Sequence, residues 1–199
     1  GDLNIDPDHV QRLVGPRTKA ICPVHLAGQP CEMEALLELG LPIVEDAAHA
    51  FESIYHGRKI GSLSDATCFS LYATKSVAAG EGGLIATNRD DVAEAVQELR
   101  LMRRSHGSLY DIAVPGYKAN LSDVLAAIAL VQLGKVGRHG EIRRRHFERY
   151  DDAVADLDGI EPVPRDERDT HARHLYVVRI DAERSGATRD AYPQALAAE

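Results

Sequence analysis

Two short stretches hold the residues whose types and order could do chemistry. The first, IVEDAAHAFES at positions 43–53, is an apolar run that ends in two acids, Glu45 and Asp46. The second, DATCFSLYATKSVAAGEGG at positions 65–83, is a β-branched and aromatic run followed by small residues, Lys75 and glycines. Because ligand-binding groups collect at the carboxyl ends of strands in α/β sheets, both stretches are candidates for one site.

The residue types alone leave the role of the two acids open. Glu45 and Asp46 could be a general acid and base, a metal site, or one functional acid beside a structural one. The three cysteines are odd in number and form no CxxC pair, which predicts reduced, mostly buried thiols. The spacing of Cys22, His25 and Cys31 matches no zinc pattern, so we expect no metal site.

The elements that position these residues alternate in the manner of an α/β fold. Short β-branched runs predict strands, and apolar residues at helical spacing predict helices between them. The expected strands are residues 20–24, 42–44, 67–71, 84–87 and 175–180, and the expected helices are residues 33–39, 90–103, 123–133 and 141–157.

Two of these helices and the glycines carry further expectations. The helix at 90–103 has acids in its first turn and an apolar stripe, so it should pack on a sheet. The helix after the candidate N-cap Ser122 is apolar nearly all round and should be buried before it stops at Gly134. Glycine-marked breaks are expected at 57–61, 80–83 and 134–140.

Four blocks in a fixed order carry a resemblance. EDAAHA, FSLYATK, GEGG and GYKANLSD, together with HLAGQP at 25–30, resemble the signature blocks of the DegT/DnrJ/StrS aminotransferases. The resemblance implies a fold-type I α/β transferase that depends on pyridoxal 5'-phosphate (PLP). It also implies that residues 1–140 are part of the PLP-binding large domain, and that residues 141–199 are a connecting helix and the start of the small C-terminal domain.

The same resemblance assigns roles residue by residue. Lys75 would form the Schiff base with the cofactor and later move the reacting proton, and Asp46 would bond the protonated pyridine nitrogen. His49 would lie near the cofactor's phenolic oxygen, Ser70 would bind the phosphate, and Asn120 would reach the cofactor of the neighbouring subunit. Simpler roles stay open: a cap at Asp46, a buried structural histidine at His49, a backbone-bonded serine at Ser70 and a turn residue at Asn120. The GEGG glycines match no nucleotide-binding fingerprint and predict a turn that brings the chain back beneath the lysine.

The function that the resemblance implies is transfer of an amino group from glutamate or glutamine to a nucleotide-linked keto-sugar, by a homodimer. One alternative is a sibling PLP-dependent dehydratase, in which histidine replaces the lysine; Lys75 argues against it. The other is a truncated, non-catalytic remnant, because family members usually run longer and we find no counterpart of their phosphate-binding turn or ring-stacking aromatic.

Composition limits the partners. The formal net charge of −8 leaves no long basic face for nucleic acid, and the arginines at 143–145 read as a solvated helix face. No apolar run approaches the roughly 20 residues that span a bilayer, and the first residues lack the pattern of a secretory signal. We therefore expect a cytoplasmic protein that binds neither nucleic acid nor membrane.

Overall fold

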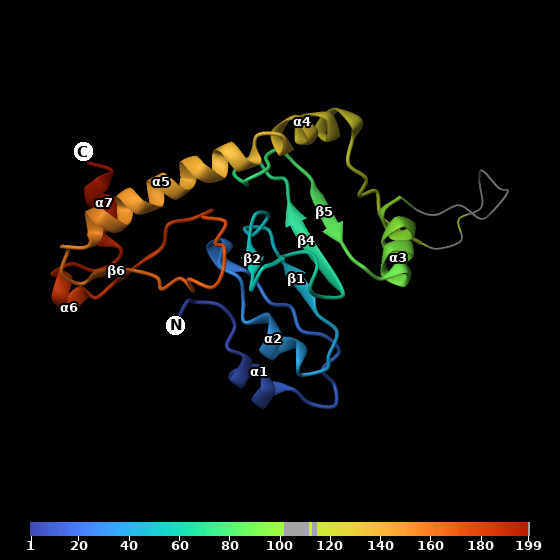
Figure 1. Cartoon of the computed structure of the whole chain (residues 1–199), viewed down its shortest axis with the longest axis horizontal. Helices are drawn as coiled ribbons and strands as arrows, with labels where there is room; N and C mark the ends of the chain where they lie inside the picture. Colours follow the sequence, from blue (N-terminus) through green and yellow to red (C-terminus); the bar gives the residue numbers. More distant parts are fainter. Residues whose placement is uncertain (102–111, 113–114, 199) are drawn as a thin grey trace.

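A computed structural model describes residues 1–101, 112 and 115–198. A small sheet lies at the centre, with the N-terminal helices on one side of it and a long helical run across its other end (Figure 1). The C-terminal strand pair and short helices lie around the far end of that run (Figure 1). The mixed order of strands and helices confirms the expected α/β class.

The central sheet is built from β1 (Val44–Asp46), β4 (Ala66–Ser70) and β5 (Gly83–Ala86), in the order β1-β4-β5. β1 and β4 are parallel, whereas β4 and β5 are antiparallel. The predicted strand at 20–24 runs parallel to β1 as an extended segment, with bridges from Ile21 to Ile43 and from Val24 to Asp46. The two candidate stretches therefore end at the same edge of one sheet.

A hairpin follows β1. It joins β2 (Ile54–Tyr55) to β3 (Arg58–Lys59), and its turn residues His56 and Gly57 have φ of 44° and 81°. Positive φ at both turn positions is the geometry that matches the twist of paired strands. The predicted glycine break at 57–61 falls on this hairpin.

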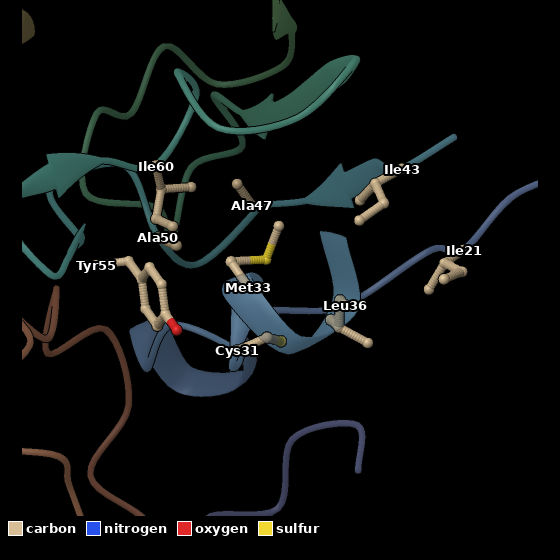
Figure 2. Packing of buried hydrophobic residues seen from close by; sticks show 9 residues of the cluster. All are labelled: Ile21, Cys31, Met33, Leu36, Ile43, Ala47, Ala50, Tyr55 and Ile60. Atoms are coloured by element: carbon tan, nitrogen blue, oxygen red, sulfur yellow. The ribbon is translucent and has the colours of Figure 1, made fainter. Parts of the chain in front are cut away.

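The main apolar core lies beneath β1 (Figure 2). It brings together α2 (Met33–Leu37), the sheet and the hairpin, and Leu36 and Ile43 are fully buried in it. Burial of one such side chain contributes about 1.5–3 kcal/mol. α1 (Pro7–Leu13), capped by Asp6, contributes Val10 to the margin. The core residues are Ile21, Cys31, Met33, Leu36, Ile43, Ala47, Ala50, Tyr55 and Ile60.

The prediction that the helix after Ser122 is buried is wrong. Ser122 does cap α4 (Asp123–Leu133) by accepting from the backbone of Leu125, but no residue of α4 is buried. The side chains of Val124 and Leu130 are 71% and 70% exposed. The helix lies at the edge of the described chain and packs through one side only, against a second core cluster of Leu71, Val77 and Ala79.

The other two long helices also differ from expectation. α3 (Asp90–Arg100) forms where predicted but has no buried residue, so it does not pack on the sheet as expected; residues 102–103 of that prediction lie outside the described residues. α5 (Val136–Val154) begins five residues earlier than predicted and runs through Gly137 and Gly140. The predicted break over 134–140 is therefore confined to its start, because a glycine weakens a helix by only about 1 kcal/mol.

The C-terminal part is a small unit against α5. It holds the antiparallel pair of β6 (Ile160–Pro162) and β7 (Val178–Ile180), followed by α6 (Ala182–Ser185) and α7 (Ala191–Leu196). Tyr176 meets the buried Phe147 of α5 edge to face, with ring centroids 5.1 Å apart. The expected division between residues 140 and 141 falls within the unbroken α5. Among the described residues, no helix is long and apolar enough to cross a membrane.

Candidate active site

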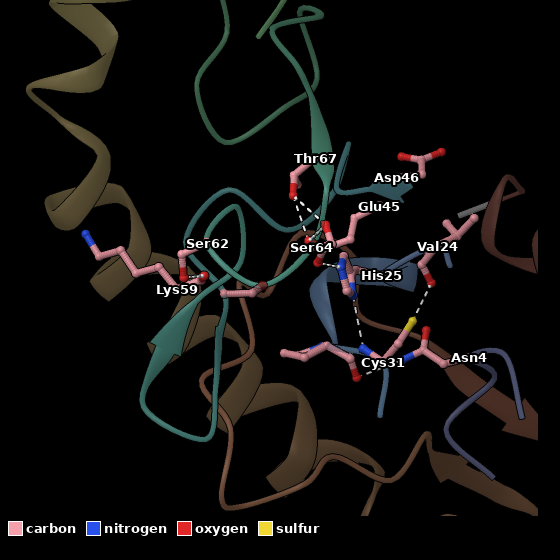
Figure 3. A network of polar contacts seen from close by, with 12 residues as sticks. Asn4, Val24, His25, Cys31, Glu45, Asp46, Lys59, Ser62, Ser64 and Thr67 are labelled. Carbon is pink, nitrogen blue, oxygen red and sulfur yellow. Dashed lines mark hydrogen bonds and ion pairs between the residues drawn. The ribbon is translucent and has the colours of Figure 1, made fainter. Parts of the chain in front are cut away.

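Glu45 and Asp46 point to opposite faces of β1 (Figure 3). Glu45 is fully buried, whereas Asp46 is exposed and lies apart from the polar network around Glu45. Alternation is the geometry of a strand, so neighbouring side chains cannot share one face. Glu45 is therefore a structural acid, and Asp46 is the one of the pair that lies on the open side of the strand.

Glu45 is held in a buried hydrogen-bond network (Figure 3). One carboxylate oxygen lies 2.7 Å from Nε2 of His25, and the other accepts from the hydroxyls of Ser64 and Thr67. Burial raises the pKa of this carboxyl, but the hydrogen bonds that it accepts outweigh burial and hold the pKa below its ordinary range. The buried charge is thus satisfied without water.

His25 joins this network to the turn that follows the 20–24 segment. The backbone N–H of Cys31 donates to Nδ1 of His25 at 3.0 Å, so a neutral ring carries its proton on Nε2 and donates to Glu45. Cys31 itself is buried, and burial raises the pKa of its thiol to about 12. Cys22, in contrast, is exposed and Cys68 is half-buried, so of the three thiols expected to be mostly buried only Cys31 is fully so.

Lys75 sits on a loop that closes back on the end of β4. Its backbone N–H donates to the carbonyl of Tyr72, and the N–H groups of Leu71 and Ala73 donate to Gly82 and Gly80. Both glycines have positive φ, at 142° and 94°. An added Cβ at Gly82 would lie 2.7 Å from a methyl of Leu121, ahead of α4. The glycines therefore form the predicted turn beneath the lysine.

An open hollow of about 380 Å³ lies at the carboxyl edge of the sheet. Asp46 and Ser70 both line it, together with Cys22, Cys68, Phe69 and other residues of β1 and β4. The side chain of Asp46 accepts from the N–H of Ala48 at 3.0 Å, and the hydroxyl of Ser70 accepts from the N–H of Tyr72 at 3.2 Å. Both local bonds were among the simpler roles left open, and both leave further bonding capacity: a second carboxylate oxygen on Asp46 and the hydroxyl proton of Ser70.

His49 lies beside this group, half-buried. Its Nδ1 accepts from the N–H of Ala27 at 3.2 Å. Its pKa lies below the ordinary value, first because of burial and then because of the positive charge of Lys75, while Asp46 acts in the opposite direction. His49 is therefore within electrostatic reach of both Lys75 and Asp46.

His174 is a neighbour that the sequence did not point to. Its ring centroid lies 4.5 Å from that of His49. Burial lowers its pKa to about 4, with smaller effects from His49, Lys75 and Arg143. The available signal was weak, since His174 stands directly before an apolar run predicted to be a strand.

Asn120 differs from the other predicted site residues, because its recorded bond within the described residues is to a neighbour in sequence. It precedes α4 half-buried, and its side chain accepts a hydrogen bond from Lys118. In the described part of the chain it makes no hydrogen bond to Asp46, Ser70 or Lys75. Within the same residues, no group of three or more His, Cys, Asp and Glu could hold a metal ion.

Comparison with known proteins adds an independent observation. Residues 1–199 match the model of the DegT/DnrJ/EryC1/StrS aminotransferase family. The chain belongs to this aminotransferase family. Its fold is accordingly that of the PLP-dependent aminotransferases among its structural neighbours.

Individual members of the aminotransferase family are similar over nearly the whole chain. The spore coat polysaccharide biosynthesis protein SpsC of Bacillus subtilis (strain 168) is 41% identical over 98% of this chain and 54% of its own length. DesI, solved in the presence of its TDP-sugar product, is 34% identical with a TM-score of 0.89, over 98% of this chain and 50% of its own. The PLP form of Spr1654 from Streptococcus pneumoniae is 32% identical with a TM-score of 0.85, over 98% of this chain and 56% of its own. The chain thus spans about half the length of the family members that it matches.

Proposed function

We propose that this protein is a PLP-dependent aminotransferase that moves an amino group from glutamate or glutamine to the keto carbon of a nucleotide-linked sugar. The observation that carries the proposal is the pairing of Asp46 with Ser70 in one hollow, beside the Lys75 loop. DesI, a structural neighbour with a TDP-sugar product, supports the nucleotide-linked substrate. Because the chain spans about half of its relatives, the proposal concerns the activity of the whole protein.

The donor set fits PLP by its chemistry. Asp46 offers a carboxylate for a protonated ring nitrogen, Ser70 offers a hydroxyl proton for a phosphate oxygen, and Lys75 offers a primary amine for an aldehyde. When bound, the cofactor supplies an electron sink for the substrate carbon that loses its proton. Lys75, on its closed loop, would take up that proton at its amine and return it to the reacting atoms.

Lys75 also supports one of the two enzyme classes considered for the sequence over the other. The dehydratase alternative replaces this lysine by histidine, and here the lysine stands on the loop with its expected neighbours. The described chain therefore favours amino transfer.

The proposal extends to the assembly and to the domains. The exposed apolar side chains of Val124 and Leu130 on α4, next to Asn120, support a homodimer in which Asn120 reaches the partner's cofactor. We assign residues 1–140 to the large cofactor-binding domain and residues 141–199 to the connecting helix and the start of the small domain. A cytoplasmic location accords with the nucleotide-sugar substrate.

The test is an absorbance titration of the purified chain with PLP. A visible band that depends on Lys75 is expected, so Lys75→Ala should abolish it while Lys59→Ala, on the exposed β3, leaves it unchanged. Asp46→Asn should weaken cofactor binding by roughly 10- to 100-fold, because a hydrogen bond to a charged group contributes about 1.5–3 kcal/mol. A band that is equally strong in Lys75→Ala, or no band at all, would contradict a cofactor site on this chain.

A further inference from the structure

His174 reaches the site from far along the chain. It belongs to the segment before β7 and is separated from His49 by most of the sheet and all of α5 in sequence. The two imidazoles nevertheless lie 4.5 Å apart between centroids, with an angle of 35° between their planes. Two half-buried rings that cover one another in this way protect each other from water.

The turn that holds both histidines is η1 (Leu26–Gly28). The N–H of Ala27 donates to Nδ1 of His49 at 3.2 Å, and the carbonyl of the same residue accepts from the N–H of His174 at 3.0 Å. Ala27 has φ of 58°, a left-handed conformation that a non-glycine residue rarely adopts. One residue in a strained conformation therefore bonds both the ring of His49 and the backbone of His174.

Neighbouring bonds fix the turn in place. The carbonyl of Gly28 accepts from the N–H of Ala172 at 3.0 Å and from the hydroxyl of Ser53 at 2.7 Å. An added Cβ at Gly28 would lie 2.9 Å from both Ala172 Cβ and the carbonyl oxygen of His49. The segment before β7 is thus seated on the turn at backbone level, and His174 has little freedom to leave His49.

The bond from Ala27 determines where the proton of His49 can be. A backbone N–H can only donate, so Nδ1 of His49 must offer its lone pair. A neutral ring then carries its proton on Nε2, and a doubly protonated ring would lose the bond. The turn selects the neutral form and one tautomer of that form.

The charges around His49 favour the same form. Lys75 from the loop after β4 is positive, and Arg143 from α5 adds a positive charge near His174, where the chain pairs it with Glu52. Asp46 from β1 is the negative group that acts on His49, and its effect is smaller than those of burial and Lys75. Protonation of either imidazole would add a positive charge to a half-buried site that already holds one.

We propose that His174 is a positioning residue of the Lys75 site, which holds His49 as a neutral imidazole with its proton on Nε2. The assignment of that N–H to an anionic oxygen of the cofactor rests on the proposed function. The positioning itself is a property of this chain and needs no cofactor. His174 acts through His49 and is not assigned to the reacting atoms.

The experiment is a long-range ¹H–¹⁵N correlation spectrum of the histidine rings, followed over pH on the chain without cofactor. In the wild type, His49 should show the Nε2–H tautomer and titrate below the ordinary histidine value of about 6.5. His174→Ala should raise the midpoint of His49 by about one pH unit, because the covering ring is lost. His174→Phe, which keeps a covering ring, should leave the midpoint near its wild-type value.

Three results would overturn the inference: an Nδ1–H tautomer in the wild type, a His49 midpoint unchanged in His174→Ala, or the same rise in His174→Phe. If circular dichroism shows that the alanine variant does not fold, the tautomer of the wild type and the His49 midpoint in His174→Phe still test the inference. Failure of the proposed function is separate, because absence of a Lys75-dependent PLP band leaves the histidine spectra unchanged. A normal PLP band with an unaffected His49 would refute the positioning role alone.

Discussion

The two faces of β1 treat neighbouring carboxylates in opposite ways. On the closed face, Glu45 has no exposure and receives hydrogen bonds from His25, Ser64 and Thr67. On the open face, Asp46 meets a hollow and receives one bond from its own following turn. A carboxylate whose hydrogen-bonding capacity is filled within the fold cannot bind a ligand, whereas a carboxylate with unused capacity can. Two neighbouring residues of β1 therefore divide into a structural acid and a candidate binding acid.

The largest effect on stability should come from removing the buried carboxylate of Glu45. Glu45→Ala should lower the free energy of unfolding by about 3–5 kcal/mol, because it leaves buried polar partners unpaired. Urea denaturation followed by circular dichroism measures the change. The matched control, Asp46→Ala, removes one local cap and should cost about 1 kcal/mol. Equal losses for the two variants would show that the faces do not differ as described.

The η1 turn, which holds the segment before β7, should give the next largest effect. Gly28→Ala places a Cβ against Ala172 and the carbonyl of His49 at a φ of 101°, and should destabilise the chain by about 2–3 kcal/mol. Gly57→Ala is the control, since its φ is also positive at 81° but nothing lies within 4 Å of the added Cβ. The control should lose only the backbone cost of about 1 kcal/mol. Thermal melting would distinguish the two, and identical losses would mean that the turn can yield.

Acid should reduce the stability that Glu45 contributes to the fold. The folded-state pKa of Glu45 lies below its ordinary value, so its contribution is present above the unfolded pKa and is lost as pH falls through the folded pKa. Below about pH 4.3, the ordinary glutamate value, wild-type stability should therefore decline more steeply than that of Glu45→Gln, which has no carboxylate to protonate. Urea midpoints measured from pH 6 downward for both proteins test this. Parallel curves would assign the acid sensitivity to other carboxylates.

The sequence predicted the open face better than the closed one. Asp46, Ser70 and Lys75 were named from the family resemblance, and strand ends and a glycine turn are the local signals beside them. In the structure Asp46 and Ser70 end neighbouring strands and Lys75 lies on the loop that follows. The role of Glu45 could not be decided, because its partners lie about 20 residues away in either direction and no local pattern reports their distance. His174 was missed for the same reason: the turn at Ala27 that holds it is made by tertiary contacts.

For the helices, the sequence predicted the positions better than the burial and the ends. Apolar composition predicted that α4 is buried, because composition reports how much surface should be covered and not by what. In the described chain one side of α4 is covered, through Leu125 and Ala129, and the other side is not. The early start of α5 was missed because its glycines were read as a break, whereas propensity is a weak guide where tertiary packing compensates.

The smallest effect on the fold should come from α4, whose two sides repeat the contrast seen on β1. Leu130→Glu changes a side chain that is 70% exposed, so the free energy of unfolding should stay within about 0.5 kcal/mol. Leu125→Glu is the matched variant on the covered side, close to Gly80, and should be clearly destabilising. If the exposed side is the proposed homodimer surface, Leu130→Glu should convert a dimer to a monomer in sedimentation while the fold persists. A wild-type chain that remains monomeric as its concentration rises would refute the dimer surface, and a large loss of stability in Leu130→Glu would mean that this side is covered within the chain itself.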